Sequence, residues 1–300
     1  MSRIDRALRI REGGEGSVPT EPHDGHADGA SSLQQYDREE RRIEPQAVPE
    51  SPARRAQPDV ATRPTSARRP KFAVDGERKA RLVTGTSSAV SVEQYRKLAA
   101  VLHEEQVRSQ LKTVIVTSAV PGEGKTLTVV NLALTFSESY GRRVLVIDAD
   151  LRGPSLHSAL NVANDRGLSD ALKDDRSVFF EPVSSRLAVL PAGTPGPTPL
   201  ADLASERMAA ILEECATRFD WVLIDTPPVG LLPDAQVLAR LAGAVLFVVG
   251  AGRTPAATVE RAIGELGGPD AIFGVVLNRV EERRIPGSGY YDHYQTAPGK

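Results

Sequence analysis

The sequence predicts an α/β fold in which helices cover both faces of a mainly parallel β-sheet, the doubly wound arrangement. Six apolar runs of strand length lie between residues 113 and 280, and most of them are continuously apolar rather than alternating. Continuous runs are typical of parallel strands that are covered on both faces. Segments with helical spacing separate most of these runs, and such alternation folds through right-handed crossovers.

The predicted elements follow one another in a fixed order. A helix comes first, at 91–107, with apolar residues spaced along one side and Ser91 placed to cap its first turn. The strands are predicted at 113–119 (TVIVTSA), 142–149 (RRVLVIDA), 186–193 (RLAVLPAG), 220–226 (DWVLIDT), 243–250 (GAVLFVVG) and 272–280 (IFGVVLNRV). The helices between them are predicted at 125–138, 201–218, 234–241 and 255–266.

The remainder of the chain divides by composition. Residues 12–80 are rich in Gly, Pro, Ser, Arg and Glu and lack a sustained apolar period, which predicts a disordered linker. Residues 1–11 have the spacing of a short helix, either transient or used to dock on a partner. The folded domain is therefore expected at 81–285, with a flexible tail at 286–300.

Charge, cysteine content and hydropathy exclude several classes of protein. A formal net charge of −2 argues against a general nucleic-acid-binding protein, which usually carries a basic excess. The single cysteine, Cys215, cannot form an internal disulfide or hold a metal alone, and it fits a reducing compartment. The longest apolar stretch, 241–252, is shorter than the ~20 residues of a bilayer span. We expect a cytoplasmic protein that reaches the inner face of a membrane only through a partner.

A phosphate-binding loop is predicted where the first strand gives way to a helix, in the sequence SAVPGEGKTL. Gly122 and Gly124 let the backbone curl around phosphate oxygens, and the following helix adds its positive dipole. Lys125 is placed to reach the β- and γ-phosphates, and the Thr126 hydroxyl to bind Mg²⁺. The general motif begins with Gly, and here that position is Ala119. ATP and Mg²⁺ are the expected cofactors, held by Pro121, Gly122, Glu123, Gly124, Lys125, Thr126 and Leu127.

Carboxylates follow two of the predicted strands. Asp148 and Asp150 come at the end of the strand at 142–149, and Asp225 ends the strand at 220–226. Ligands bind at the carboxyl edge of a parallel sheet, so these side chains are expected beside the phosphate loop. Mg²⁺ bound to nucleotide phosphates prefers hard oxygen ligands, which predicts a metal site at Thr126, Asp150 and Asp225.

The stretches AVPGEGKT, VLVIDADLRGPSLH and VLIDTPPVG together resemble the bacterial tyrosine kinases of capsule and exopolysaccharide synthesis. The resemblance covers about residues 90–295 and implies the deviant-Walker, MinD/ParA-like P-loop ATPase fold. It implies a protein-tyrosine autokinase that regulates exopolysaccharide or capsule polymerisation and export. The catalytic residues that it implies are Lys125, Asp148, Asp150, Arg152 and Asp225, with Asp148 expected to accept the tyrosine proton. The opening MSRIDRALR resembles the exosortase-associated subgroup.

Three of the six tyrosines, Tyr290, Tyr291 and Tyr294, lie in the C-terminal tail. The resemblance implies that they are the phosphoacceptors; the alternative is a tail with chance tyrosines. The last predicted strand should run parallel to the others, so the chain leaves it at the nucleotide edge. The residues from Val280 to Tyr290 can then span ~30 Å when extended, enough to reach their own site or a neighbour's.

The resemblance also implies partners. We expect a homo-oligomer, activation by the cytoplasmic tail of a separate membrane chain-length-determinant or polysaccharide co-polymerase protein, and reversal by a phosphotyrosine phosphatase. The oligomerisation helix of the family has Glu, Arg three residues on, and Arg three further. Glu93 and Arg96 match this pattern, whereas the third position is Ala99.

Two other functions compete with the kinase. A nucleotide-switched positioning or partitioning ATPase would hydrolyse ATP without phosphotransfer, but usually has a lysine early in the loop, where this chain has Ala119, Val120 and Pro121. A partner that only binds nucleotide is disfavoured by the intact lysine and carboxylates. Asn278, after the last strand, either reads the adenine edge or forms a turn. Asp234 is expected to cap a helix, the alternative being an acid near the γ-phosphate.

Overall fold

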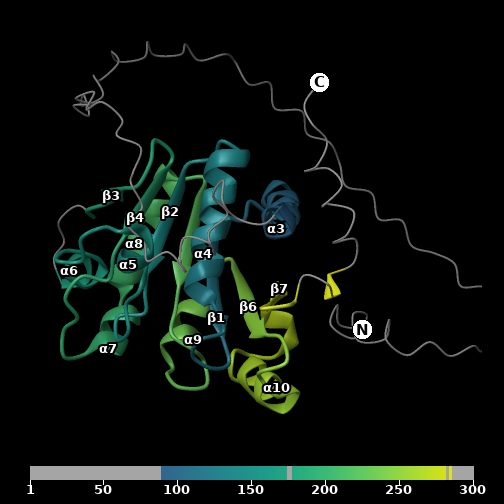
Figure 1. Cartoon of the computed structure of the whole chain (residues 1–300). Coiled ribbons are helices and arrows are strands. Elements are labelled where there is room, and N and C mark those ends of the chain that lie inside the picture. The colour runs from purple at the N-terminus through teal and green to yellow at the C-terminus, as the bar shows by residue number, and fades with distance from the viewer. Residues whose placement is uncertain (1–88, 174–177, 282–283, 286–300) are drawn as a thin grey trace, which may run out of the picture. The chain divides into compact units, whose positions relative to one another are not determined.

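The computed structural model describes residues 89–173, 178–281 and 284–285. The core of the domain is a seven-stranded sheet (Figure 1). The strands lie side by side in the order β3-β4-β2-β5-β1-β6-β7. Their bounds are Thr113–Ser118 (β1), Val144–Asp148 (β2), Glu181–Pro182 (β3), Leu187–Leu190 (β4), Trp221–Asp225 (β5), Ala244–Gly250 (β6) and Gly274–Asn278 (β7). Within the sheet only the β3–β4 pairing is antiparallel. The prediction of a mainly parallel sheet is confirmed.

Helices cover both faces of this sheet (Figure 1). One face packs against α3 (Ala89–Ser109), α4 (Lys125–Leu134), the π-helical turn Thr135–Ser139 and α5 (Leu156–Leu160). The other packs against α6 (Leu168–Lys173), α7 (Pro199–Leu203), α8 (Glu206–Arg218), α9 (Asp234–Ala239) and α10 (Ala256–Glu265). A short 3-10 turn, Pro269–Ala271, precedes β7.

The continuous apolar runs follow from this two-sided cover. In β1, Val114 and Val116 are buried in the layer that holds α3 and α4, whereas Ile115 is buried in the layer that holds α8 and α9. On the α4 side, the ring of Phe136 stacks on that of Trp221 with centroids 4.5 Å apart. Neither face of the central strands is therefore left to solvent, so no polar alternation is needed.

Helices α5 and α6 were not predicted, the predicted helix at 125–138 is α4 followed by a π-helical turn, and three further differences have a clear physical reason. The helix predicted at 201–218 is two helices, because Ser205 interrupts it and accepts a hydrogen bond from the Met208 amide as the N-cap of α8. The two-residue strand β3 was not predicted, since a pair of residues is too short to show a pattern. Helix α3 already includes Ala89, so the predicted cap at Ser91 is wrong.

The parallel strands bring their carboxyl ends to one edge of the sheet. The phosphate loop follows β1, Asp148 and Asp225 end β2 and β5, and Asn278 ends β7. None of the helices in the described ranges is both long and apolar enough to cross a bilayer. The helix predicted at 1–11, the linker at 12–80 and the tail at 286–300 with its tyrosines lie outside the described residues.

Candidate active site

The loop between β1 and α4 has the backbone that a phosphate-binding loop needs. Gly122 and Gly124 have φ angles of 76° and 97°, in the left-handed region that favours glycine. Ala119 is not among the residues with positive φ, so alanine is tolerated where the general motif has glycine. Helix α4 begins at Lys125, so its N-terminal dipole points at the loop.

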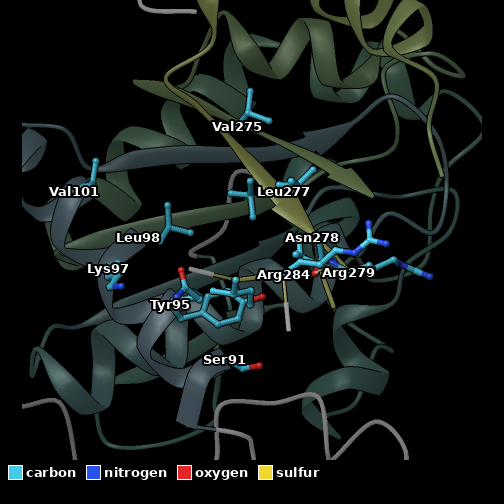
Figure 2. Close-up of a pocket in the computed structure, with 14 residues that line it drawn as sticks. Ser91, Tyr95, Lys97, Leu98, Val101, Val275, Leu277, Asn278, Arg279 and Arg284 are labelled. Atoms are coloured by element: carbon cyan, nitrogen blue, oxygen red, sulfur yellow. Dashed lines mark hydrogen bonds between the residues drawn. The ribbon is translucent and has the colours of Figure 1, made fainter. Parts of the chain in front are cut away.

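The end of β7 is tied to this loop. Asn278 donates from Nδ2 to the Glu123 carbonyl at 2.7 Å, and the guanidinium of Arg279 donates to the Gly122 carbonyl. A Cβ atom on Gly124 would lie 2.1 Å from Asn278 Nδ2, so a larger residue there would displace the Asn278 side chain. Figure 2 shows Asn278 and Arg279 together at the end of β7. Asn278 therefore holds the loop, and its contact with adenine stays a prediction.

Two of the predicted metal ligands already lie in contact. The Thr126 hydroxyl donates to Asp225 Oδ2 at 2.6 Å and lies 2.8 Å from Ser155 Oγ. Asp225 is 1% exposed, and its Oδ1 atom accepts no hydrogen bond from any described residue. A buried carboxylate oxygen without a donor is costly, which indicates that a ligand completes this site.

Asp148 and Asp150 follow the same edge but differ in exposure. Asp148 is fully buried, and its carboxylate accepts the backbone amides of Ser155 at 3.0 Å, Leu156 at 2.9 Å and Asp150 at 3.3 Å. Asp150 is partly exposed and accepts the Gly153 amide at 2.9 Å. Asp148 thus orders the turn into α5, and Asp150 can reach a bound ligand.

The electrostatics of the pair follow from burial. Burial raises the pKa of Asp148 to about 7, and the nearby Asp150 carboxylate acts in the same direction, although the three backbone amides that donate to Asp148 lower it. Burial and, next, the Asp148 carboxylate raise the pKa of Asp225 to about 8, although the Thr126 hydroxyl and the Lys125 ammonium lower it. The two residues are register partners on β2 and β5, so their carboxylates compete for negative charge.

The donor set fits a magnesium ion that nucleotide phosphates help to hold. In the described ranges, no group of three or more His, Cys, Asp and Glu side chains could hold a metal alone. Mg²⁺ commonly uses one or two carboxylates and fills its other positions with phosphates and water. The orphan oxygen of Asp225 and the adjacent Thr126 hydroxyl are oxygen ligands of that kind.

Arg152 and Asp234 lie close together at this edge. Arg152 Nε is 3.7 Å from Asp234 Oδ1, and the Arg152 side chain is 44% exposed. Asp234 is buried, and neither carboxylate oxygen accepts a hydrogen bond from a described residue. The expectation that Asp234 caps a helix is therefore wrong, because Pro233 occupies the N-cap of α9. The contact instead orients Arg152.

The predicted oligomerisation pattern on α3 is only partly available to a neighbour. Glu93 and Arg96 form an exposed ion pair at 3.5 Å. Ala99, at the third position of the pattern, is fully buried in the layer that holds α4. A groove of about 560 Å³ between α3 and β7 (Figure 2) is lined by residues that include Tyr95, Asn278 and Ile285.

A Gly-rich loop at a strand–helix junction, with a lysine, a threonine and strand-end aspartates beside it, defines a P-loop nucleotide-binding domain. Residues 114–292 match the CobQ/CobB/MinD/ParA nucleotide binding domain. The tyrosine-protein kinase YwqD of Bacillus subtilis (strain 168) is 34% identical over 209 residues, which are 68% of this chain and 87% of YwqD. The chain belongs to that nucleotide-binding family and, within it, to the bacterial tyrosine-protein kinases.

Two further proteins are similar to this chain. The kinase domain of the Escherichia coli tyrosine kinase ETK is 30% identical with a TM-score of 0.59, and the match covers 64% of this chain and 78% of that one. The succinoglycan biosynthesis transport protein ExoP of Rhizobium meliloti (strain 1021) is 30% identical over 228 residues. That match covers 74% of this chain but only 28% of ExoP.

Sequence reasoning missed three features of the site. These are the buried carboxylate of Glu123, its donor Thr254 and the contact of Arg279 with the loop. Their partners are 127 to 157 positions away in the chain, so no local pattern marks them. The positive φ of Arg279, 61°, is a sign of its constrained position that appears only in three dimensions.

Proposed function

We propose that this chain is an ATP-dependent protein-tyrosine kinase that transfers the γ-phosphoryl group of ATP to tyrosines of its own C-terminal tail. The observation that carries the proposal is the buried Thr126–Asp225 contact beside Lys125, in a chain of the tyrosine-kinase family. A pseudo-enzyme would be free to lose these groups. The 34% identity to YwqD selects phosphotransfer to tyrosine over the switch function of partitioning ATPases.

Each group in the site has a role in this proposal. The Lys125 ammonium neutralises charge on the β- and γ-phosphates, and the backbone of residues 121–127 surrounds them. The Thr126 hydroxyl and the Asp225 and Asp150 carboxylates would hold the metal, directly or through water. Bound Mg²⁺ would supply charge neutralisation at the β- and γ-oxygens. Asn278 is proposed to contact the adenine edge.

Asp148 is proposed to accept the tyrosine proton. A free phenol has a pKa of about 10, so transfer near neutrality needs a base. Burial raises the pKa of Asp148 to about 7, which is closer to the working range of a base than an ordinary carboxylate. Arg152, which contacts Asp234, is proposed to neutralise charge on the transferring group.

The acceptor tyrosines are proposed to come from a neighbouring subunit. Strand β7 runs parallel to β6, so the chain leaves the sheet at the nucleotide edge. Arg284 and Ile285 line the groove beside α3. Tyr290, Tyr291 and Tyr294 are the acceptors, and the exposed Glu93–Arg96 pair on α3 is a candidate contact between subunits.

The biological setting follows by analogy with the relatives. We propose that the kinase regulates polymerisation and export of an exopolysaccharide or capsule, since ExoP is named for succinoglycan biosynthesis and transport. The cytoplasmic tail of a membrane co-polymerase would activate it and recruit it to the inner membrane face. A phosphotyrosine phosphatase would reset it. Each phosphate adds about −1.5 to −2 charges, so modified tails would repel one another and favour release.

The test is phosphotyrosine mapping of the full chain. The purified protein is incubated with Mg–ATP, alone and with the cytoplasmic tail of a candidate co-polymerase, and analysed by intact mass and peptide mapping. We expect phosphate on Tyr290, Tyr291 or Tyr294. Lys125→Met should abolish labelling, because the ammonium is needed at the phosphates while the unbranched Met stem preserves packing.

A matched control shows whether the loss of labelling is specific to Lys125 or follows the replacement of a lysine at another position. Lys173, exposed on α6, is replaced by Met in the same background and should label at the wild-type rate. ATP hydrolysis without phosphotyrosine, in the presence of an activating tail, would support the partitioning-type ATPase instead. Labelling of Lys125→Met at the wild-type rate would overturn the assignment of the phosphate loop.

A further inference from the structure

The side chain of Glu123 is buried although the residue lies within the phosphate loop. It is 3% exposed, and its oxygens accept three hydrogen bonds from outside its own residue. Oε1 accepts the Gly250 amide at 3.0 Å and the Thr254 hydroxyl at 2.6 Å. Oε2 accepts the Val120 amide at 3.1 Å, which closes the loop on itself. The side chain therefore joins the loop to the turn that follows β6.

The ends of β7 and β1 hold the loop through its backbone. The carbonyl of Glu123 accepts from Asn278, and the carbonyl of Gly122 accepts from Arg279. Ser118 donates from its hydroxyl to the Val120 carbonyl at 2.8 Å. Consecutive residues of the loop are thus fixed by three separate segments, so their amide groups keep one orientation before any ligand arrives.

Electrostatics indicate that the Glu123 carboxylate is not a phosphate ligand. A carboxylate next to phosphate oxygens would repel them, and the contacts of this one are all with hydrogen-bond donors. Burial raises the pKa of Glu123, but the donors, chiefly Thr254 and the Gly250 and Val120 amides, outweigh it and leave the pKa lowered. The group is therefore held as a charged acceptor, and charge-assisted hydrogen bonds are the strong ones.

We propose that Glu123 is a positioning residue, whose carboxylate holds the empty phosphate loop in its anion-binding shape by linking it to the turn at Gly250–Thr254. This proposal rests on the nucleotide site described above but not on the identity of the phosphate acceptor. Preorganisation lowers the ordering cost of binding, so its loss should weaken nucleotide binding. It should leave the chemical step at saturating ATP much less affected.

The contacts predict a graded series of variants. Glu123→Ala removes every acceptor. Glu123→Gln keeps an oxygen for Gly250 and Thr254 but turns an amide NH₂ toward the Val120 N–H, so it should be intermediate. Thr254→Val removes only the hydroxyl donor at nearly constant shape, and Thr254→Ser restores it. Thr254 is outside the residues assigned to ATP and Mg²⁺, so this pair isolates the link.

The experiment measures the Kd of Mg–ADP and Mg–ATP for the full-length variants by calorimetry, together with KM and kcat for autophosphorylation. Losing one or more charge-assisted hydrogen bonds should raise Kd about tenfold or more in Glu123→Ala and about three- to tenfold in Thr254→Val. Thr254→Ser should stay within about twofold of wild type. Hydrogen exchange of the loop amides at 122–124 should rise in the same order in the nucleotide-free protein.

Wild-type Kd values in both Glu123→Ala and Thr254→Val would overturn the proposal. So would a fall in kcat with Kd unchanged, since that would make the carboxylate part of the chemistry. If Glu123→Ala does not fold, the comparison of Thr254→Val with Thr254→Ser still tests the proposal. Equal Kd values for these two variants would show that the hydrogen bond from Thr254 to Glu123 does not support nucleotide binding. A wild-type chain that binds ATP but never phosphorylates tyrosine would refute the kinase assignment but not this proposal, because the Kd values of the variants can still be compared.

Discussion

Replacing Gly124 by alanine should destabilise the domain by an amount that the structure allows us to work out. The added Cβ would lie 2.1 Å from Asn278 Nδ2, so the Asn278 side chain must move and give up its hydrogen bond to the Glu123 carbonyl. The φ of 97° also strains a non-glycine residue, at about 1–3 kcal/mol. An unmade hydrogen bond adds about 1–3 kcal/mol, so we expect a loss of about 2–6 kcal/mol.

A double-mutant cycle separates the two contributions. In an Asn278→Ala background the clash is absent, and Gly124→Ala should cost only the backbone term of about 1–3 kcal/mol. The assay is the free energy of unfolding from denaturant titration of the nucleotide-free protein, with Gly264→Ala as control, since its Cβ position is open. Equal costs of Gly124→Ala in both backgrounds would refute the reasoning that Asn278 dictates the glycine.

Two further predictions follow from burial and composition. The raised pKa values of Asp148 and Asp225, about 7 and about 8, mean that the folded protein holds protons that the unfolded chain releases near pH 4. The free energy of unfolding without nucleotide should therefore fall as pH rises from about 4 to about 8, and Asp225→Asn should flatten this dependence. The affinity for Mg–ATP should rise between pH 6 and 8. A free energy of unfolding that does not change with pH would contradict the argument from burial. Deleting residues 12–80 should leave the melting temperature nearly unchanged, since that composition contributes no core; a loss of many degrees would show that the segment packs on the domain.

The sequence was sufficient for the fold and for the outline of the site, because both depend on local patterns. Continuous apolar runs predict strands buried on both faces, and parallel strands necessarily bring Asp148 and Asp225 to the edge that carries the phosphate loop. The loop itself is recognisable because Gly122 and Gly124 are needed for backbone angles that other residues avoid. Each of these inferences uses residues within a few positions of one another.

The remaining features could not be predicted, because they depend on which segments meet in space. Asp234 precedes a helical stretch and has the residue type of a cap, yet the helix begins one residue too early for that role. Glu123 was expected among the residues that hold ATP because of its place in the loop, but its carboxylate accepts hydrogen bonds from Gly250 and Thr254, which are far away in the chain. A buried acid is stable only where such partners converge, and convergence is a property of the tertiary fold.

The direction of phosphate transfer between subunits can be tested by mixing two inactive chains. A tail anchored beside its own pocket would have to turn sharply back to place a tyrosine in line with the γ-phosphate, whereas a neighbour's tail can enter extended. One chain carries Lys125→Met and keeps its tyrosines; the other carries Tyr290→Phe, Tyr291→Phe and Tyr294→Phe and keeps its lysine. Neither should label alone.

In the mixture, the Lys125→Met chain should become phosphorylated, and the rate should rise with protein concentration because the step requires an encounter between subunits. Mass differences between the two chains identify which one is labelled. Ala99, the third position of the oligomerisation pattern on α3, is buried and cannot contact a neighbouring subunit. The encounter therefore has to use other residues. If the mixture does not label while wild-type labelling per molecule is independent of concentration, transfer occurs within one chain, and the groove beside Ile285 must let the tail fold back.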